Sequence, residues 1–304
     1  MPGSTADGDH GQLLTQSPVM LDAATLARIE VRDPGIRERL AHVEMWDITY
    51  LSDRLNVTGV LVQPNGPGPY PCLIYNRGGS REDGVLTPED TAAYLVPVAR
   101  WGYLVVASNY RGNGGGEGRD EFGGVDVNDV CHLIPLLEHL PRADPSRIGM
   151  WGWSRGGLMT YRALTRTDRI AAAIIVAGIT DAFDYIARRP DMEQVLSELI
   201  PDYARNKHAA LETRSPMRWA EHLCKRTPLL VLHGSSDWRV HPTQALRMAG
   251  VLYEHQHPFR LVFLEGGDHA LTEYQAETSA LYRAWLDYYV RDKRPWPNLA
   301  PHGV

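Results

Sequence analysis

Ser154 lies in the stretch RIGMWGWSRGGLMTYRAL (147–164), with Gly152 and Gly156 around it in the pattern G-x-S-x-G. A serine hydroxyl attacks a carbonyl only when a neighbouring base takes its proton. A pattern this short also arises by chance, and a serine before a helix can simply cap it. It therefore predicts a nucleophile only if a strand precedes it, a helix follows it, and an acid and a histidine come later in the chain.

An acid and a histidine follow Ser154 in that order. The segment PLLVLHGSSDWRVHP (228–242) places Asp237 three residues after the glycine that ends a strand-like run. The segment FRLVFLEGGDHAL (259–271) places His269 in the turn after the last such run. We expect His269 to take the serine proton and Asp237 to orient the imidazole, as in the order Ser, Asp, His of α/β-hydrolases.

Other residues compete for the roles of base and acid. His233 ends a strand and is expected to make a structural hydrogen bond, whereas His255 and His257 are expected in solvent at a helix end. Asp181 follows the sixth strand, where some hydrolases of this fold carry their acid, and it stays an alternative. The remaining competitors are His241, which precedes a helix, and Asp268, which would point away from the histidine beside it.

Acyl transfer also needs N–H donors aimed at the oxyanion that develops in the transition state. The backbone N–H of Arg155, directly after the serine, is the first expected donor. The loop YNRGGSRED (75–83) should supply the second from the N–H of Arg77 or Gly78, and the Arg77 side chain is a further candidate. A plain glycine turn with a surface arginine is the alternative.

Four residues are also assigned to substrate binding, namely Trp153, Arg77, Asp181 and Trp238. A site for a free amine would need acids, for which Asp181, Asp184 and Glu193 are candidates. No H-E-x-x-H and no P-loop occurs, so we expect neither a metal nor another cofactor. The glycines of RGNGGGEG (111–118) do not match G-x-G-x-x-G, and we expect a flexible loop that borders the site.

Short apolar runs from residue 71 onward alternate with helical stretches, which predicts a parallel sheet covered on both faces. Two runs with alternating character, at 42–52 and 54–64, precede them as an antiparallel pair. Together they predict an α/β-hydrolase-like fold, an eight-stranded, mostly parallel, doubly wound sheet. The six parallel runs cover 71–76, 102–109, 147–153, 170–178, 228–234 and 259–266, and the helices lie near 88–101, 125–140, 154–167, 242–256 and 272–291.

The interval 179–225 is too long for a simple crossover and is expected to form a helical cap over the carboxyl ends of the strands. A decorative helical excursion is the alternative. Residues 1–40 form an N-terminal extension, of which 1–20 are small and polar and are expected to be flexible. The catalytic domain then spans 41–291, and 292–304 form a C-terminal tail.

Composition narrows the class of protein. The chain has 304 residues, 43% of them hydrophobic and 22% charged, and a formal net charge of −6, which argues against a nucleic-acid partner. Three separate cysteines, no signal-peptide pattern and no apolar run of the ~20 residues that span a bilayer predict a cytoplasmic protein without a membrane contact. A homo-oligomer stays open.

Several segments in order resemble the catalytic domain of prolyl oligopeptidase-type serine hydrolases, which have the α/β-hydrolase fold. They are ASNYRGNGGGEG, DVNDV, RIGMWGWSRGG, RSP, PLLVLHGSSDWRVHP and GGDHAL, and the likeness covers about 55–290. The resemblance implies that Ser154, Asp237 and His269 form the catalytic triad. Arg77 and Arg155 depart from it, because family members often carry a tyrosine or histidine at the first position and a tyrosine at the second. We expect the arginines at both positions to change the polarity of the pocket mouth.

Only about 40 residues precede the first predicted strand, so we expect no N-terminal β-propeller to select peptides. A carboxylesterase acting on small or medium acyl esters is therefore the first functional prediction. An aminopeptidase or acylaminoacyl-peptidase that takes a short peptide is the alternative. A non-catalytic binding protein of the same fold is the third, disfavoured because all three triad residues are present.

Overall fold

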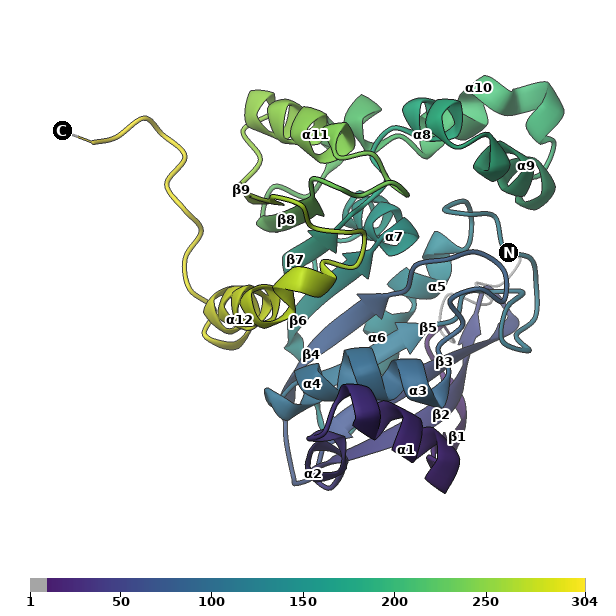
Figure 1. Cartoon of the computed structure of the whole chain (residues 1–304), viewed down its shortest axis with the longest axis vertical. Coiled ribbons are helices and arrows are strands. Elements are labelled where there is room, and N and C mark those ends of the chain that lie inside the picture. The colour runs from purple at the N-terminus through teal and green to yellow at the C-terminus, as the bar shows by residue number, and fades with distance from the viewer. Residues whose placement is uncertain (1–9, 304) are drawn as a thin grey trace, which may run out of the picture.

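A single nine-stranded sheet runs through the computed structural model, which describes residues 10–303 (Figure 1). Its order is β1-β2-β3-β5-β4-β6-β7-β8-β9, with antiparallel pairing up to β5 and parallel pairing from there on. The strands are β1 Leu13–Pro18, β2 Val43–Ser52, β3 Leu55–Pro64, β4 Tyr70–Asn76, β5 Leu104–Ser108, β6 Ala143–Trp153, β7 Ile170–Val176, β8 Leu229–Gly234 and β9 Phe259–Leu264.

Helices cover both faces of this sheet. On one face lie α1 Ala23–Arg32, α2 Ile36–Leu40, α3 Pro88–Asp90, η1 Thr91–Leu95, α4 Val96–Arg100, α12 Gln275–Leu286 and η5 Asp287–Arg291. On the other lie α5 Val127–Cys131, α6 Leu133–His139, α7 Arg155–Leu164 and α11 Thr243–Glu254. The doubly wound α/β architecture predicted from the sequence is confirmed.

Successive side chains of a central strand enter different cores. In β4, Cys72 and Ile74 belong to the apolar cluster beneath α5, α6, α7 and α11, whereas Leu73 and Tyr75 belong to the cluster on the opposite face. Because side chains alternate along a strand and both faces are buried, the strand is a continuous apolar run rather than an alternating one. This is why the sequence pattern identified the parallel strands.

The ninth strand was not predicted. Residues 13–18, expected to be flexible, pair antiparallel with β2 as β1, and five of their six side chains are exposed. Backbone hydrogen bonds to β2 hold this edge strand, and its sequence LLTQSP lacks the alternation of apolar and polar residues that would have predicted it. The prediction for residues 1–9 lies outside the described residues.

The interval after β7 is helical, as predicted. It contains α8 Ala182–Arg188, α9 Pro190–Leu199 and α10 Tyr203–Thr213, followed by the short turns η2 Pro216–Arg218 and η3 Ala220–His222. Figure 1 places α8, α9 and α10 beyond the ends toward which the parallel strands point. Their apolar side chains form a separate cluster with Phe122, Leu158 and Val240, so the cap packs on α7 and on the loops that carry Phe122 and Val240.

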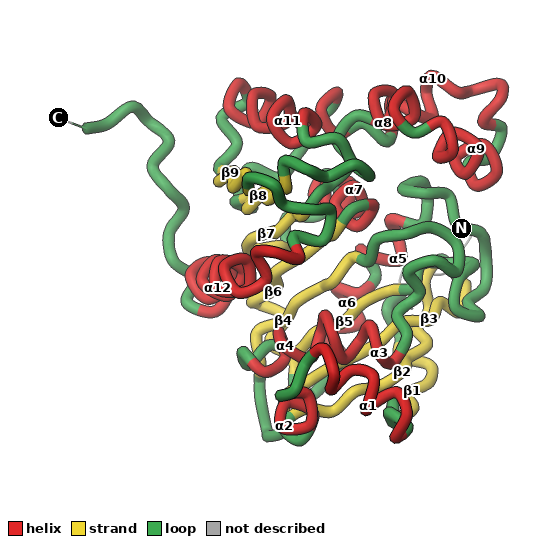
Figure 2. The backbone as a smooth tube through the Cα atoms, in the orientation of Figure 1, coloured by secondary structure: helices red, strands yellow, loops and turns green. Residues whose placement is uncertain are grey.

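The chain ends in a segment without helix or strand, residues 292–303, which leaves the body beside α12 (Figure 2). After η3, the chain passes through Leu223 and returns to the sheet as β8. Among the described helices, none combines the length and the apolar character needed to cross a bilayer.

Candidate active site

Ser154 occupies a strained turn between β6 and α7. Its φ and ψ are 58° and −121°, in a region that residues with a side chain seldom adopt. A Cβ at Gly156 would lie 1.8 Å from the carbonyl oxygen of Asn76, and one at Gly152 would lie 2.1 Å from that of Gly156. Only glycine fits at either position, so the G-x-S-x-G pattern here reflects a sharp strand-turn-helix elbow.

His269 and Asp237, which come from loops after β9 and β8, meet in the structure. Nδ1 of His269 lies 2.8 Å from Oδ2 of Asp237, while Oδ1 accepts hydrogen bonds from the N–H groups of Arg239 and Val240 at 2.8 and 3.0 Å. Burial alone would raise the pKa of Asp237, but the hydrogen bonds from His233 and His269 outweigh it and hold that pKa well below its ordinary value. The carboxylate is therefore ionised and can orient an imidazole.

His233 is a site residue whose role the sequence did not reveal. Its Nε2 lies 2.9 Å from the carbonyl oxygen of Val240, the structural bond we expected, and also 3.1 Å from Oδ2 of Asp237. Because both neighbours are acceptors, Nε2 must carry the proton. In the sequence, the available signal for this role was the spacing of four residues between His233 and Asp237, across a turn.

Trp153 links the elbow to the histidine loop. Its indole Nε1 donates a hydrogen bond to the carbonyl oxygen of His269 at 3.0 Å, and the two rings lie 5.4 Å apart between centroids. A residue adjacent to the serine thus holds the backbone of the proposed base. Trp153 was assigned to substrate binding from the sequence, and this contact gives it a positioning role.

The loop after β4 lies against the serine. A Cβ at Gly78 would come within 3.2 Å of Cβ of Ser154, so this loop passes directly beside the elbow. The N–H of Arg155 is at the first position of α7, where no carbonyl of the helix is available to accept it. The N–H of Arg155 therefore has no acceptor within its helix, and the loop that carries Arg77 and Gly78 runs beside the serine, where the sequence predicts an oxyanion hole.

The Arg77 side chain does not point toward this site as an extra donor. It is 1% exposed and donates to the carbonyl oxygens of Asn109, Gly78, Asp83 and Arg81. Burial and the positive charge of Arg155 lower the pKa of Arg77 to about 10. The surface-arginine alternative is likewise wrong, because the guanidinium serves the inside of its own loop.

Arg155 is buried too, so neither arginine makes the pocket mouth polar. Its guanidinium forms salt bridges with Asp120 at 2.5 Å and Asp126 at 2.6 Å, and it is 1% exposed. Burial by itself would raise the pKa of Asp120, but Arg155 outweighs this and lowers it well below the usual range. The glycine-rich segment 111–118, expected to be a flexible loop, leads directly into Asp120 and places it for this contact.

The other two predicted substrate-binding residues, Asp181 and Trp238, have different surroundings. The Asp181 carboxylate caps α8 by accepting from the N–H of Phe183 at 3.0 Å, and it pairs with Arg247 at 3.1 Å. Trp238, next to Asp237, is 68% exposed, and the guanidiniums of Arg189 and Arg239 lie about 5 Å from its ring centroid. Asp181 thus has structural partners, whereas Trp238 presents an open surface.

A cleft of about 600 Å³ lies on the face of the sheet between α12 and the α3–η1–α4 segment. Figure 1 shows these helices on the same face, with strands of the sheet between them. Trp153 and Ala270 line it, and they are the chain neighbours of Ser154 and His269. Its aromatic walls are Tyr75, Tyr94, Trp101, Trp151, Trp153 and Tyr282.

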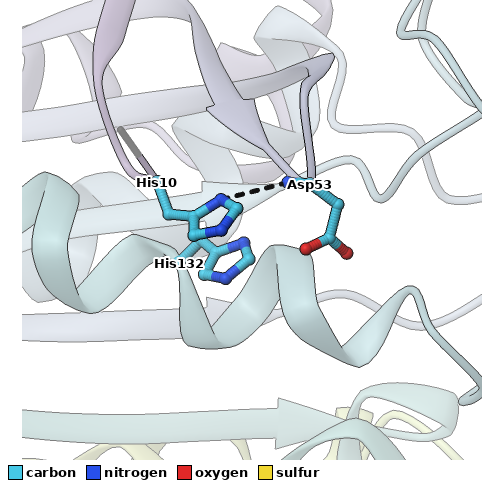
Figure 3. A group of neighbouring side chains, drawn as sticks. All are labelled: His10, Asp53 and His132. Atoms are coloured by element: carbon cyan, nitrogen blue, oxygen red, sulfur yellow. Dashed lines mark hydrogen bonds between the residues drawn. The ribbon is translucent and has the colours of Figure 1, made fainter. Parts of the chain in front are cut away.

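One group of side chains within residues 10–303 has the composition of a metal site: His10, Asp53 and His132 (Figure 3). The two imidazoles are stacked, with centroids 4.1 Å apart and parallel planes. Lone pairs in parallel planes do not converge on one ion, and Oδ2 of Asp53 already accepts from Arg111 and Asn128. The arrangement instead anchors the segment that enters β1, since Nδ1 of His10 accepts from the N–H of Asp53.

The fold and this site define the class: an α/β-hydrolase with a serine at the elbow and a paired histidine and aspartate after later strands. Residues 90–293 match the prolyl oligopeptidase family. The chain belongs to that family and is a serine hydrolase.

Three similar proteins place the chain more closely. The uncharacterized peptidase YtmA of Bacillus subtilis is 31% identical over 200 residues, which are 66% of this chain and 76% of that protein. The acylamino-acid-releasing enzyme of Homo sapiens is 27% identical over 276 residues, 83% of this chain and 36% of the enzyme. The acylaminoacyl peptidase of Pyrococcus horikoshii shares the fold, with a TM-score of 0.72, 23% identity, and coverage of 88% of this chain and 45% of that one.

The named relatives favour the peptidase alternative over the carboxylesterase that was predicted first. The chain spans about three quarters of the Bacillus protein but well under half of the human enzyme. The activity of those longer enzymes therefore reaches this chain only as a proposal.

Proposed function

We propose that this chain is a serine peptidase of the acylaminoacyl-peptidase type, which cleaves short peptides whose N-terminal residue carries an acyl group. The observation that carries the chemistry is the 2.8 Å contact of His269 with Asp237 beside the strained Ser154 elbow. The peptidase names among its relatives support the reaction on amides.

The three residues divide the reaction between them. Oγ of Ser154 attacks the scissile carbonyl and passes its proton to His269, while Asp237 stabilises the imidazolium that forms. The N–H groups of Arg155 and of the Arg77–Gly78 segment bind the oxyanion. His269 then protonates the leaving amine, and a water molecule, activated by the same imidazole, releases the acyl group from Ser154.

The preference for a blocked N-terminus rests on the acids of the cap. A free α-amine would need an unpaired carboxylate, for which the sequence offered Asp181, Asp184 and Glu193. Asp181 pairs with Arg247, Asp184 with Arg188 at 3.0 Å, and Glu193 with Lys207. With their charges already compensated, these acids favour a neutral, acylated N-terminus over a charged one.

Three substrates test the proposal. Two of them share a leaving group, p-nitroaniline, and two share an acyl group, N-acetyl-alanyl. We would compare kcat/KM for N-acetyl-alanine p-nitroanilide, alanine p-nitroanilide and the p-nitrophenyl ester of N-acetyl-alanine, with Ser154→Ala as the blank. We expect the acetylated anilide to be cleaved at least about 10-fold faster than the free one, and all turnover to be lost in Ser154→Ala. Faster cleavage of the free anilide would favour an aminopeptidase. Ester cleavage without anilide cleavage would restore the carboxylesterase.

A further inference from the structure

Tyr110, which follows β5, is fully buried and has a φ of 62°. A left-handed conformation costs a tyrosine of order 1 kcal/mol or more, and it persists only where the surroundings enforce it. Here the Tyr110 N–H donates to Oγ of Ser108 at 3.0 Å, and its hydroxyl donates to the carbonyl oxygen of Arg77 at 3.0 Å. The strained backbone therefore aims the phenol at the loop beside Ser154.

The carbonyl that accepts this bond shares a peptide group with the N–H of Gly78. That peptide is trans and planar, so its C=O and N–H point in opposite directions, and a bond that holds one orients the other. A hydrogen bond to the carbonyl also polarises the peptide and makes its N–H a better donor. Of the two donors left open by the sequence, Arg77 and Gly78, this favours Gly78.

Arg155 holds the same loop two residues further on, at Gly79. Its Nη1 lies 3.3 Å from the carbonyl oxygen of Gly79 and 2.8 Å from Asp120, so the carboxylates that bind the guanidinium also keep it in reach of the loop. The guanidinium carbons of Arg77 and Arg155 each lie 4.8 Å from the centroid of the Tyr110 ring. The phenol thus packs against both arginines at cation–π distance.

We propose that the Tyr110 hydroxyl and the Arg155 side chain form a clamp that positions the N–H of Gly78 as the second oxyanion donor. The first donor is the N–H of Arg155 itself, so one residue joins both halves of the oxyanion hole. Tyr110 and the Arg155 guanidinium touch no substrate and act as positioning groups. The inference rests on the proposed serine hydrolase mechanism and concerns only how its oxyanion hole is assembled.

Tyr110→Phe tests the clamp, because it removes only the hydroxyl and keeps the ring between the arginines. We expect kcat per active site to fall about 10-fold with KM nearly unchanged, since removal of a whole donor costs about 100-fold or more and this donor is only misaligned. Affinity for an N-acetyl-alanine trifluoromethyl ketone, which forms a tetrahedral adduct on serine, should fall by the same factor. Titration of active serines with a fluorophosphonate probe corrects for any unfolded fraction.

Tyr161→Phe is the matched control, because Tyr161 is buried in α7 and its hydroxyl has no partner among the described residues. It should leave kcat and the ketone affinity at wild-type values. If Tyr110→Phe behaves like Tyr161→Phe after titration, the clamp is wrong, whatever the melting temperature. If Tyr110→Phe does not fold, Arg155→Lys replaces it as the test, because it keeps the charge and the backbone N–H. It must then show the same drop in kcat and in ketone affinity. Wild-type values in Arg155→Lys would overturn the clamp. Failure of the wild type to bind the probe would instead refute the serine hydrolase mechanism.

Discussion

His233 places its Nε2 3.1 Å from Oδ2 of Asp237, the same oxygen that accepts a hydrogen bond from Nδ1 of His269. The side chains of His233 and Asp237 are both fully buried. Two imidazoles and two backbone N–H groups therefore hold one carboxylate. This arrangement leaves Asp237 little freedom to rotate away from the proposed base.

Asp237→Asn should lower kcat by about 10³- to 10⁴-fold, because an amide can hold His269 in the wrong tautomer and cannot stabilise an imidazolium. His233→Gln should lower it by only about 10-fold, because Asp237 keeps His269 and both backbone donors. Steady-state rates normalised by active-site titration would check both. Equal losses in the two variants would mean that the hydrogen bond from His233 matters as much to the orientation of His269 as the charge of Asp237 does, against this prediction.

Gly156→Ala should destabilise the protein by about 2–4 kcal/mol and abolish activity, since its Cβ would overlap the carbonyl oxygen of Asn76 at 1.8 Å. Gly250→Ala is the control, because a Cβ on this α11 residue meets no atom within 4 Å. That change should be neutral or stabilise the helix by up to about 1 kcal/mol. Urea unfolding of both variants makes the comparison. An active, stable Gly156→Ala would show that the elbow relaxes.

Arg155→Met should cost about 3–5 kcal/mol of unfolding free energy, because Asp120 and Asp126 stay buried but each loses its salt bridge with Arg155. Adding Asp120→Asn and Asp126→Asn should recover much of that loss. Arg81→Met, which removes an exposed pair with Glu198, should cost less than about 1 kcal/mol. Denaturant unfolding gives all three values. No recovery in the triple variant would mean that packing, rather than charge, explains the cost.

His257 predicts a dependence of stability on pH. It was expected in solvent but is 2% exposed, with Nε2 3.0 Å from the carbonyl oxygen of Thr227. Burial lowers its pKa to about 4, so below about pH 6.5 the unfolded chain binds a proton that the folded chain does not. Stability is then full above pH 7 and falls as the pH drops, by about 2 kcal/mol from this residue between pH 7 and pH 5.

Urea unfolding at pH 7, 6 and 5 measures this contribution. His257→Gln should lose that part of the slope, whereas His208→Gln, which changes an exposed residue on α10, should keep it. Identical slopes in wild type and His257→Gln would contradict the assignment.

Local patterns explain how much of this molecule was predictable. The parallel strands were found because each contains an apolar run of the expected length, and β1 was missed because five of its six side chains are exposed and its pairing with β2 runs through the backbone. His257 was predicted in solvent because it follows the end of α11. In the structure it is buried, with its Nε2 against the carbonyl oxygen of Thr227, a residue distant in sequence.

The sequence by itself determined the class of fold and the identity of the proposed nucleophile, acid and base, because each follows the end of a strand that its own neighbours specify. Only the tertiary structure decided where Arg77 and Arg155 point, that His233 shares Asp237, and which residues line the aromatic cleft. These contacts join residues such as Tyr110 and Arg77, 33 positions apart, or Arg155 and Asp120, 35 apart. Such pairs meet only because the strand order brings β5, β4 and β6 together in the sheet.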